Sequence, residues 1–359
     1  MTTTTATSGW LSQSAQARLA LRLREARRRA HRDAPVLVSV SEPLAGEHDP
    51  ASIVLASRAG TEPWFCLEQP ARERMAHAGL GLALELEASG RQRFEQLARR
   101  WRALSEHALS DAPDAPSGSG LVAVAGFAFA DEGGLSPAWQ GFGPASLTVP
   151  AVWLARRGDA TWITCNAAVG PDDDAGALLE GVLRRVARLR EHPLPLLDPA
   201  PVGEFSVHSP MPPTHYEEAV ARAVQRIRAG ELEKVVLARE VQVRAPQTHD
   251  PGAVLDVLRG GFPDCFVYAV GRGEATFVGA TPELLVRKEG MRASTVALAG
   301  SIRRSADPAV DAHLGESLLH SAKNRHENLV VAQRIAAQLA PYSVWVTAQP
   351  EPVLIKVAN

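Results

Sequence analysis

Residues 230–240 have the sequence GELEKVVLARE, a glycine followed by a short apolar run that contains one lysine. The β-branched residues and the period-2 alternation predict a strand from Leu232 to Val243. Lys234 then shares one strand face with apolar side chains. Most lysines in such a position pack their stems and extend the ammonium to water. The alternative is a partly desolvated amine that can act as a general base, and this strand alone leaves both open.

The segments on either side of this run give clear signals. Apolar residues at helical spacing predict a helix over 215–229, opened by a capping box of Thr214 and Glu217 and ended at Gly230. The elements predicted after the run are strands at about 264–270, 275–280 and 284–288, an apolar strand over 295–304, and a helix over 309–340.

The N-terminal part combines helical and strand patterns. Helices are predicted over 14–31, 91–109 and 174–191, and strands over 35–43, 52–57, 63–68, 121–130, 147–158 and 160–169. A proline-rich stretch over 191–203 marks a boundary. The predicted organisation is a disordered segment 1–12, an N-terminal region 13–203 and a second domain 204–359.

Composition excludes several classes of function. The chain has 359 residues, 45% of them hydrophobic, and a formal net charge of −2. These values predict a globular protein without the basic surface that nucleic acid requires, and no apolar run is long enough for a bilayer. The three cysteines stand alone, which fits the cytoplasm. Neither a dinucleotide fingerprint nor a P-loop is present.

Three further motifs could contribute to a site. Glu283 follows Thr281-Pro282 and is either a turn carboxylate in solvent or, if buried, a carboxylic acid that holds its proton. A glycine at 300 lets backbone N–H groups approach an anion, or simply ends a strand. Glu327 lies four residues after Lys323 and forms either an i,i+4 pair on a solvated helix face or a ligand for Mg²⁺.

In order and spacing, EKVVLARE, FVGATPELLVRKEG, ALAGSIRR and SAKNRHENLVV resemble the chorismate-binding domain of isochorismate synthases. The resemblance is strong from about 212 to 359 and weaker before it. It implies an α+β fold with a two-subdomain antiparallel β-sandwich flanked by helices, as in anthranilate synthase component I, with the active site between the subdomains. It also implies chorismate as substrate, and we expect a cytoplasmic monomer that binds neither nucleic acid nor membrane.

The resemblance assigns roles to particular residues. Lys234 would be the base that activates water for attack at C2 of chorismate, and Glu283 the acid that protonates the departing C4 hydroxyl. Glu327 would bind Mg²⁺, which holds the C1 carboxylate. The substrate would be lined by a short segment made of Leu298, Ala299, Gly300 and Ser301. Ammonia-using relatives tend to carry glutamine at position 234, so a lysine there implies water as the nucleophile.

Two departures from the family pattern affect these expectations. The C-terminal section that carries a second Mg²⁺ glutamate and the groups for the carboxylates is absent, and Asn328 replaces a frequent histidine. We therefore expect a truncated isochorismate synthase, short of its C-terminal strands, with poor stability and little activity. The alternatives are a salicylate synthase, a non-catalytic remnant, or one half of a split enzyme. Whether isochorismate serves menaquinone, a siderophore or salicylate is left open.

Overall fold

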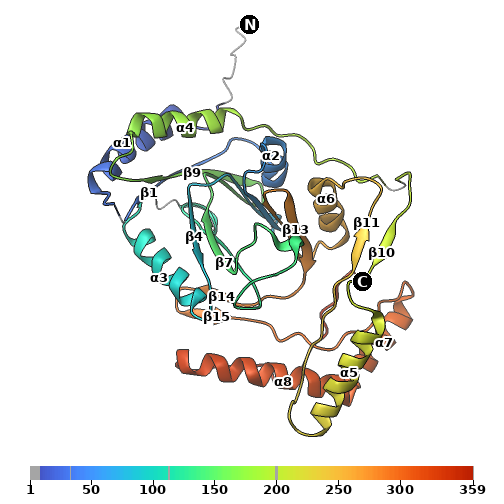
Figure 1. Cartoon of the computed structure of the whole chain (residues 1–359). Helices are drawn as coiled ribbons and strands as arrows, with labels where there is room; N and C mark the ends of the chain where they lie inside the picture. The colour runs from blue at the N-terminus through green and yellow to red at the C-terminus, as the bar shows by residue number, and fades with distance from the viewer. Residues whose placement is uncertain (1–8, 33, 112–113, 199–200, 359) are drawn as a thin grey trace. The chain divides into compact units, whose positions relative to one another are not determined.

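The structure is a computed structural model that describes residues 9–32, 34–111, 114–198 and 201–358 (Figure 1). Contacts divide the chain into two units, each formed from two separate segments. Unit 1 comprises Met1–Leu197 and Asp250–Thr281, and unit 2 comprises Asp198–His249 and Pro282–Asn359. The predicted boundary at 203/204 lies close to the first junction, but residues 250–281 pack with the N-terminal part of the chain.

An eight-stranded sheet forms the centre of unit 1. The strand order is β13-β12-β2-β3-β8-β9-β1-β5, and every pairing is antiparallel except that of β1 with β5. The strands are β1 Val36–Pro43, β2 Trp64–Gln69, β3 Met75–Leu80, β5 Leu109–Ser110, β8 Val152–Arg157, β9 Ala160–Val169, β12 Phe266–Arg272 and β13 Ala275–Thr281. The strands predicted over 35–43, 63–68, 160–169, 264–270 and 275–280 are confirmed.

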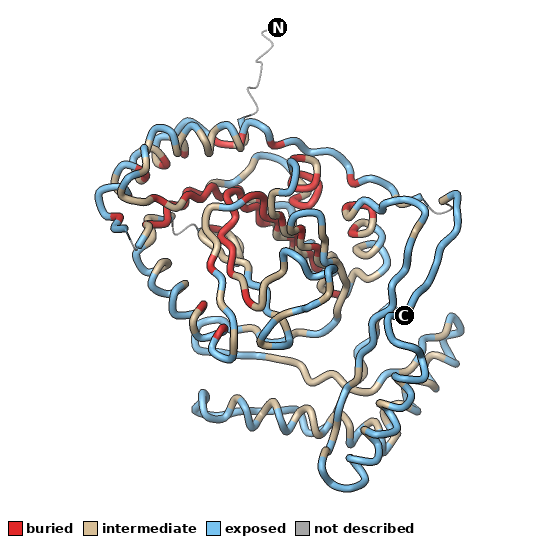
Figure 2. The backbone as a smooth tube through the Cα atoms, viewed as in Figure 1, coloured by how far each residue is buried: buried red, intermediate tan, exposed pale blue. Residues whose placement is uncertain are grey.

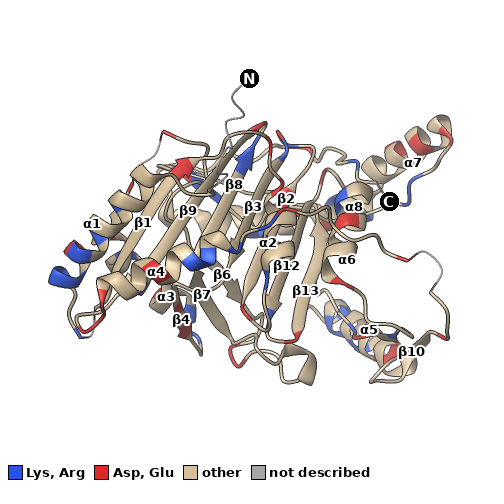
Figure 3. Ribbon diagram, turned by 90° about the horizontal axis from the view of Figure 1, so that it is seen from above, with Lys and Arg blue, Asp and Glu red and all other residues tan. Residues whose placement is uncertain are grey.

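Helices lie across one face of this sheet (Figures 1 and 3). They are α1 Gln13–Arg29, α2 Pro50–Ser57, α4 Ala175–Ala187 and α6 Pro251–Gly261. In α1, Leu19 and Leu23 are fully buried at i,i+4 spacing, whereas the last turn carries three exposed arginines. The helices predicted over 14–31 and 174–191 are confirmed. Leu11 is buried just before α1, so the packed chain begins inside the segment predicted as disordered; residues 1–8 lie outside the described residues.

The segment 52–57, predicted as a strand, is instead part of helix α2. Asp49 caps the helix, because its carboxylate accepts a 3.1 Å hydrogen bond from the N–H of Ala51, and Pro50 occupies the first turn. Ile53 and Val54 are fully buried in the core. The capping signal therefore outweighs the β-propensity of a short apolar run.

A second, three-stranded sheet completes unit 1. Its order is β4-β7-β6, with β4 Leu84–Ala88, β6 Val124–Phe127 and β7 Ala145–Val149. Helix α3, Arg93–Glu106, packs Leu97 against Leu86 and Leu147, which confirms the helix predicted over 91–109. The buried strand or strand pair predicted over 121–130 is wrong in its extent and in its burial. Only β6 forms there, at the sheet edge, and Phe127 and Phe129 are exposed.

Unit 2 consists of short hairpins and helices. Its elements are β10 Ser206–His208, α5 Pro213–Arg228, β11 Gln242–Arg244, β14 Arg287–Glu289, β15 Arg292–Ser294, α7 Pro308–His320 and α8 Ala322–Leu339. Strands β10 and β11 pair with each other, as do β14 and β15. None of the described residues of this unit is buried, as the absence of red in its trace shows (Figure 2).

The strands predicted over 232–243, 284–288 and 295–304 are largely wrong. Only Gln242–Arg244 of the first and the start of β14 in the second are strand, and the third forms none. Their sequences favour extended backbone, but a strand also needs a neighbour for its N–H and C=O groups. Over most of these runs, the described residues supply no such ladder.

Two helix boundaries also differ from the prediction. Helix α5 begins at Pro213 without a side-chain cap, so the capping box of Thr214 and Glu217 is not formed, although the helix itself is confirmed. The helix predicted over 309–340 is two helices that meet at Ser321, which ends α7 and caps α8. Its hydroxyl caps α8 by accepting a hydrogen bond from the backbone N–H of Asn324 at 3.4 Å, and it also accepts one from the Asn324 side-chain amide at 2.9 Å. Overall, the predicted α+β class with antiparallel sheets is confirmed.

Candidate active site

Lys234 and Glu327 form an ion pair within unit 2. The Lys234 ammonium nitrogen lies 3.3 Å from a carboxylate oxygen of Glu327. Their side chains are 21% and 36% exposed, so the pair is partly shielded from water. The two residues are far apart in the sequence, one in the segment after α5 and the other in α8. The structure therefore brings the predicted base and the predicted metal ligand into contact.

The partner of Glu327 is not the neighbouring lysine of its own helix. Lys323 lies one turn earlier on α8, at the spacing that favours an i,i+4 pair. Among the ion pairs of the described residues, Glu327 pairs with Lys234 and none joins it to Lys323. The interpretation of Glu327 as one end of a solvated i,i+4 pair is therefore wrong.

The segment Leu298–Ser301 lies against the same helix. The side-chain amide of Asn328 donates a 2.9 Å hydrogen bond to the carbonyl of Ala297, which immediately precedes this segment. Gly300 has a φ of +77°, and a Cβ at that position would lie 3.2 Å from Asn324 Oδ1. The glycine thus allows both a left-handed turn and a close approach to α8. Three of the predicted components, Lys234, Glu327 and this segment, meet at one stretch of α8.

Glu283 is exposed in the structure. It lies between β13 and β14, and the carbonyl of the next residue, Leu284, accepts a 3.2 Å hydrogen bond from Thr295 Oγ1. Its segment therefore runs beside the chain that leads to Leu298. The described residues do not bury this side chain. Its position matches the turn carboxylate in solvent, and its role as an acid stays a prediction.

The described residues around Glu327 offer a magnesium ion one carboxylate ligand. In the described part of the chain, no group of three or more His, Cys, Asp or Glu residues could hold a metal. Glu327 alone offers a carboxylate, and a cationic group already lies against it. Because Mg²⁺ is often held by one or two carboxylates, with waters and substrate oxygens completing its shell, a single glutamate is compatible with it.

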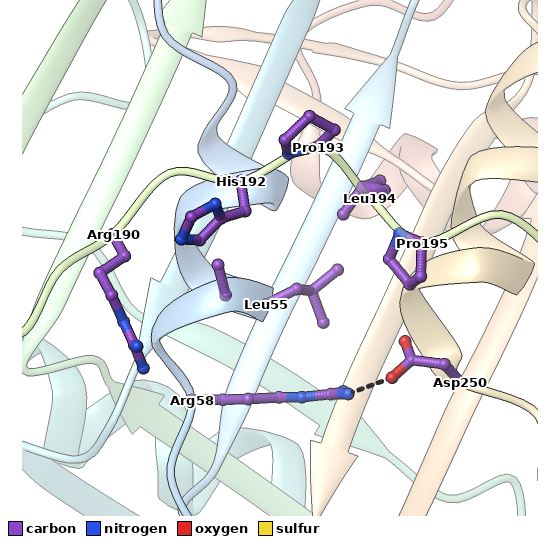
Figure 4. Close-up of a pocket in the computed structure, with 9 residues that line it drawn as sticks. Leu55, Arg58, Arg190, His192, Pro193, Leu194, Pro195 and Asp250 are labelled. Atoms are coloured by element: carbon purple, nitrogen blue, oxygen red, sulfur yellow. Dashed lines mark hydrogen bonds and ion pairs between the residues drawn. The ribbon is translucent and has the colours of Figure 1, made fainter.

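Unit 1 contains a pocket that the sequence motifs did not indicate (Figure 4). It has a volume of about 230 Å³ and is lined by three basic side chains, Arg58, Arg190 and His192, together with Leu55, two prolines and Asp250. Arg58 is paired with Asp250 at 2.7 Å. The lining comes from three separate stretches of chain, so local sequence patterns could not reveal it.

A buried carboxyl group in unit 1 also escaped the sequence interpretation. Glu68 of β2 is 2% exposed, and its nearest cation is Arg259, 3.7 Å from Oε1. Burial, reinforced by the nearby Asp49 carboxylate, raises the pKa of Glu68 to about 7. Glu68 lies at the end of a predicted strand whose pattern does not show which way its side chain points. Only the fold shows that this side chain is buried.

The comparisons with known proteins agree with these motifs. A family model described as chorismate binding enzyme matches residues 21–359. The chain belongs to the chorismate-binding enzyme family. It is 35% identical over 330 residues to the salicylate biosynthesis isochorismate synthase of Pseudomonas aeruginosa, covering 91% of this chain and 67% of that protein. It is 28% identical over 269 residues to the isochorismate synthase MenF of Bacillus subtilis, covering 75% of this chain and 56% of that protein.

Solved structures show that the fold is shared. The menaquinone-specific isochorismate synthase MenF of Escherichia coli matches with a TM-score of 0.67 and 22% identity, over 90% of this chain and 69% of that one. A putative 2,3-dihydroxybenzoate-specific isochorismate synthase, DhbC of Bacillus anthracis, matches with a TM-score of 0.58 and 21% identity, over 85% and 67%. This family member thus spans between about half and two thirds of the length of these relatives. No helix among its described residues is long and apolar enough to cross a bilayer.

Proposed function

We propose that this family member is an isochorismate synthase, which converts chorismate to isochorismate. The observation that supports this most directly is the contact between Lys234 and Glu327, because it joins a base and a carboxylate ligand in a partly shielded place. Membership of the family supports chorismate as the substrate. The similarity to proteins named as isochorismate synthases supports the type of reaction.

The proposed reaction is a displacement with an allylic shift. Lys234 takes a proton from a water molecule, whose oxygen forms a bond to C2 of the ring. The double bond moves, the C4–O bond breaks, and Glu283 gives a proton to the departing hydroxyl, which leaves as water. One water is consumed and one released, so the product is an isomer of the substrate.

The remaining residues would position the substrate. Glu327 would hold Mg²⁺, which when bound lowers the cost of bringing a dicarboxylate into the site. Asn328 donates a hydrogen bond to the carbonyl of Ala297, which would hold the turn at Gly300 in place for contact with the substrate. Because Glu283 is exposed, its function as an acid requires that the bound substrate or further protein covers it.

A turnover assay tests the proposal. Chorismate and Mg²⁺ are incubated with the protein, and isochorismate is separated by chromatography. Replacement of Lys234 by alanine should lower kcat by about a hundredfold or more, as expected for loss of a general base. The control is Lys288→Ala, since Lys288 is an exposed lysine that donates to the carbonyl of Gly290. Full turnover by Lys234→Ala would refute the role of the base.

A second candidate is a salicylate synthase, which adds a pyruvate-releasing step. It is suggested by the relative whose name refers to salicylate biosynthesis. Salicylate is fluorescent, so the same assay read by fluorescence separates the two activities. Thermal stabilisation by chorismate and Mg²⁺ with neither product would instead support a protein that binds without catalysis.

A further inference from the structure

The carboxylate of Glu327 already holds a cation. The ammonium of Lys234 lies 3.3 Å from its Oε1, and the two side chains approach from different segments of unit 2. An ammonium at this distance occupies one direction from which a metal ion could approach the carboxylate. It also places a positive charge within a few ångströms of any dication bound there.

We infer that Lys234 and a divalent cation compete for Glu327, so that the metal binds only when the lysine leaves its counter-ion. This inference rests on the proposed function for the identity of the cation. It assigns Lys234 a second role besides that of a base: it holds the carboxylate in place and weakens metal binding in the free protein. Metal binding then releases the amine towards the substrate, which sets an order of events, metal first and base second.

The neighbouring lysine provides a control within the same helix. Lys323 carries the same charge one turn from Glu327 and makes no ion pair with it among the described contacts. General repulsion of a dication by nearby positive charge would involve both lysines. Competition for the carboxylate involves only Lys234. Removing the charge of Lys234 and, separately, that of Lys323 therefore distinguishes competition for the carboxylate from general repulsion of the dication.

The test measures binding of Mn²⁺ to the full chain without chorismate, by the loss of the free-ion electron paramagnetic resonance signal. Lys234→Met keeps the apolar stem and removes the charge, and it should lower the Kd for Mn²⁺ by about tenfold, given the proximity of the two charges. Lys323→Met should change the Kd by less than about twofold. Glu327→Gln should weaken binding several-fold, and in that background Lys234→Met should have no further effect.

An unchanged or weaker affinity in Lys234→Met would overturn the inference. An equal gain in affinity in Lys323→Met, or no measurable Mn²⁺ binding by any form, would also overturn it.

A second measurement does not depend on variants. The four lysines are ¹³C-methylated, and addition of Mg²⁺ should shift the Lys234 resonance while that of Lys323 stays nearly fixed. If the protein shows this competition but no turnover of chorismate, the proposed function is disproved and the inference stands. If it turns over chorismate but shows no competition, the inference is disproved and the proposed function stands.

Discussion

The side-chain amide of Asn328 donates a hydrogen bond of 2.9 Å to the main-chain carbonyl of Ala297. The donor lies on α8, next to Glu327, and the acceptor immediately precedes the segment that contains Gly300. One hydrogen bond therefore connects the helix of the proposed metal ligand with the segment proposed to line the substrate. Asn328, which departs from the pattern expected from the resemblance, therefore has a structural partner.

Replacement of Asn328 by alanine should loosen this segment. Loss of one hydrogen bond typically costs about 1 kcal/mol, which corresponds to about fivefold faster amide exchange if the segment opens locally. Hydrogen exchange measured by mass spectrometry on peptides that cover 295–304 checks this. The control is Gln333→Ala, an exposed position on the same helix. Equal exchange in both variants would contradict the anchoring role.

Substitution of Gly300 by alanine tests the close approach to α8. The left-handed φ of +77° alone should cost about 1–2 kcal/mol for a residue with a Cβ. Gly290 is a matched control, since its φ is +56° and a Cβ there would meet nothing within 4 Å. Gly300→Ala should be the more destabilising of the two in urea unfolding, because its Cβ also lies 3.2 Å from Asn324. If Gly290→Ala costs as much, crowding by Asn324 contributes nothing.

Glu68 should make the stability of unit 1 depend on pH. Its folded pKa of about 7 is above the ordinary value of 4.5, so the folded state retains a proton that the unfolded chain has already lost. The contribution of Glu68 to stability is therefore fully present below about pH 4.5 and is lost as pH rises through 7, by about 3 kcal/mol in total. The charged groups that face Glu68 are Asp49, Arg259 and Arg156.

The measurement is urea unfolding between pH 5 and pH 8. Relative to Glu68→Gln, wild-type protein should lose stability as pH rises over this range, and the variant should be the more stable form at pH 8. Glu87→Gln, at an exposed position in β4, should follow the wild-type profile. The buried His77, whose pKa is lowered by burial, contributes a slope of the opposite sign over part of this range, so the test is the difference between wild type and Glu68→Gln. A difference that does not change with pH would contradict the raised pKa of Glu68.

Asp49 has two functions that substitutions can separate. Its carboxylate caps α2 through Ala51 and also pairs with Arg259 at 2.7 Å. Asp49→Asn retains a good cap but removes the charge, whereas Asp49→Ala removes both. We expect Asn to cost about 1–2 kcal/mol through the lost ion pair and Ala about 1 kcal/mol more through the lost cap. Equal unfolding free energies for the two variants would show that the cap is negligible.

The sequence predicted most of unit 1 because its signals are local. The alternation in β9 and the stripe of α1 follow from residues that are adjacent along the chain, and the sheet then buries them. The strand prediction for the run of α2 is wrong, because helix and strand both suit a short, mostly buried run and the deciding signal is the cap at Asp49. Extended runs such as 295–304 form a strand only with a partner, which their sequences do not specify.

The candidate site was only partly predictable. Lys234 and Glu327 were proposed for one site because their motifs resemble those of a known family, while the residue patterns alone left solvated alternatives open. Nothing in either motif specifies their mutual contact, which depends on how α8 packs against a segment from another part of the chain. Glu283 shows the opposite case: its motif was clear, but burial depends on packing and was not predictable from its neighbours.

Strands β12 and β13 have a consequence for any attempt to divide this protein. They come from the second half of the sequence but extend the sheet next to β2. A cut at the proline-rich stretch near 203 would remove two strands and α6 from unit 1, leaving β2 with an open side. The polypeptide passes from unit 1 to unit 2, back, and out again. A single crossover near residue 203 between two relatives would therefore combine strands of different origin within one sheet.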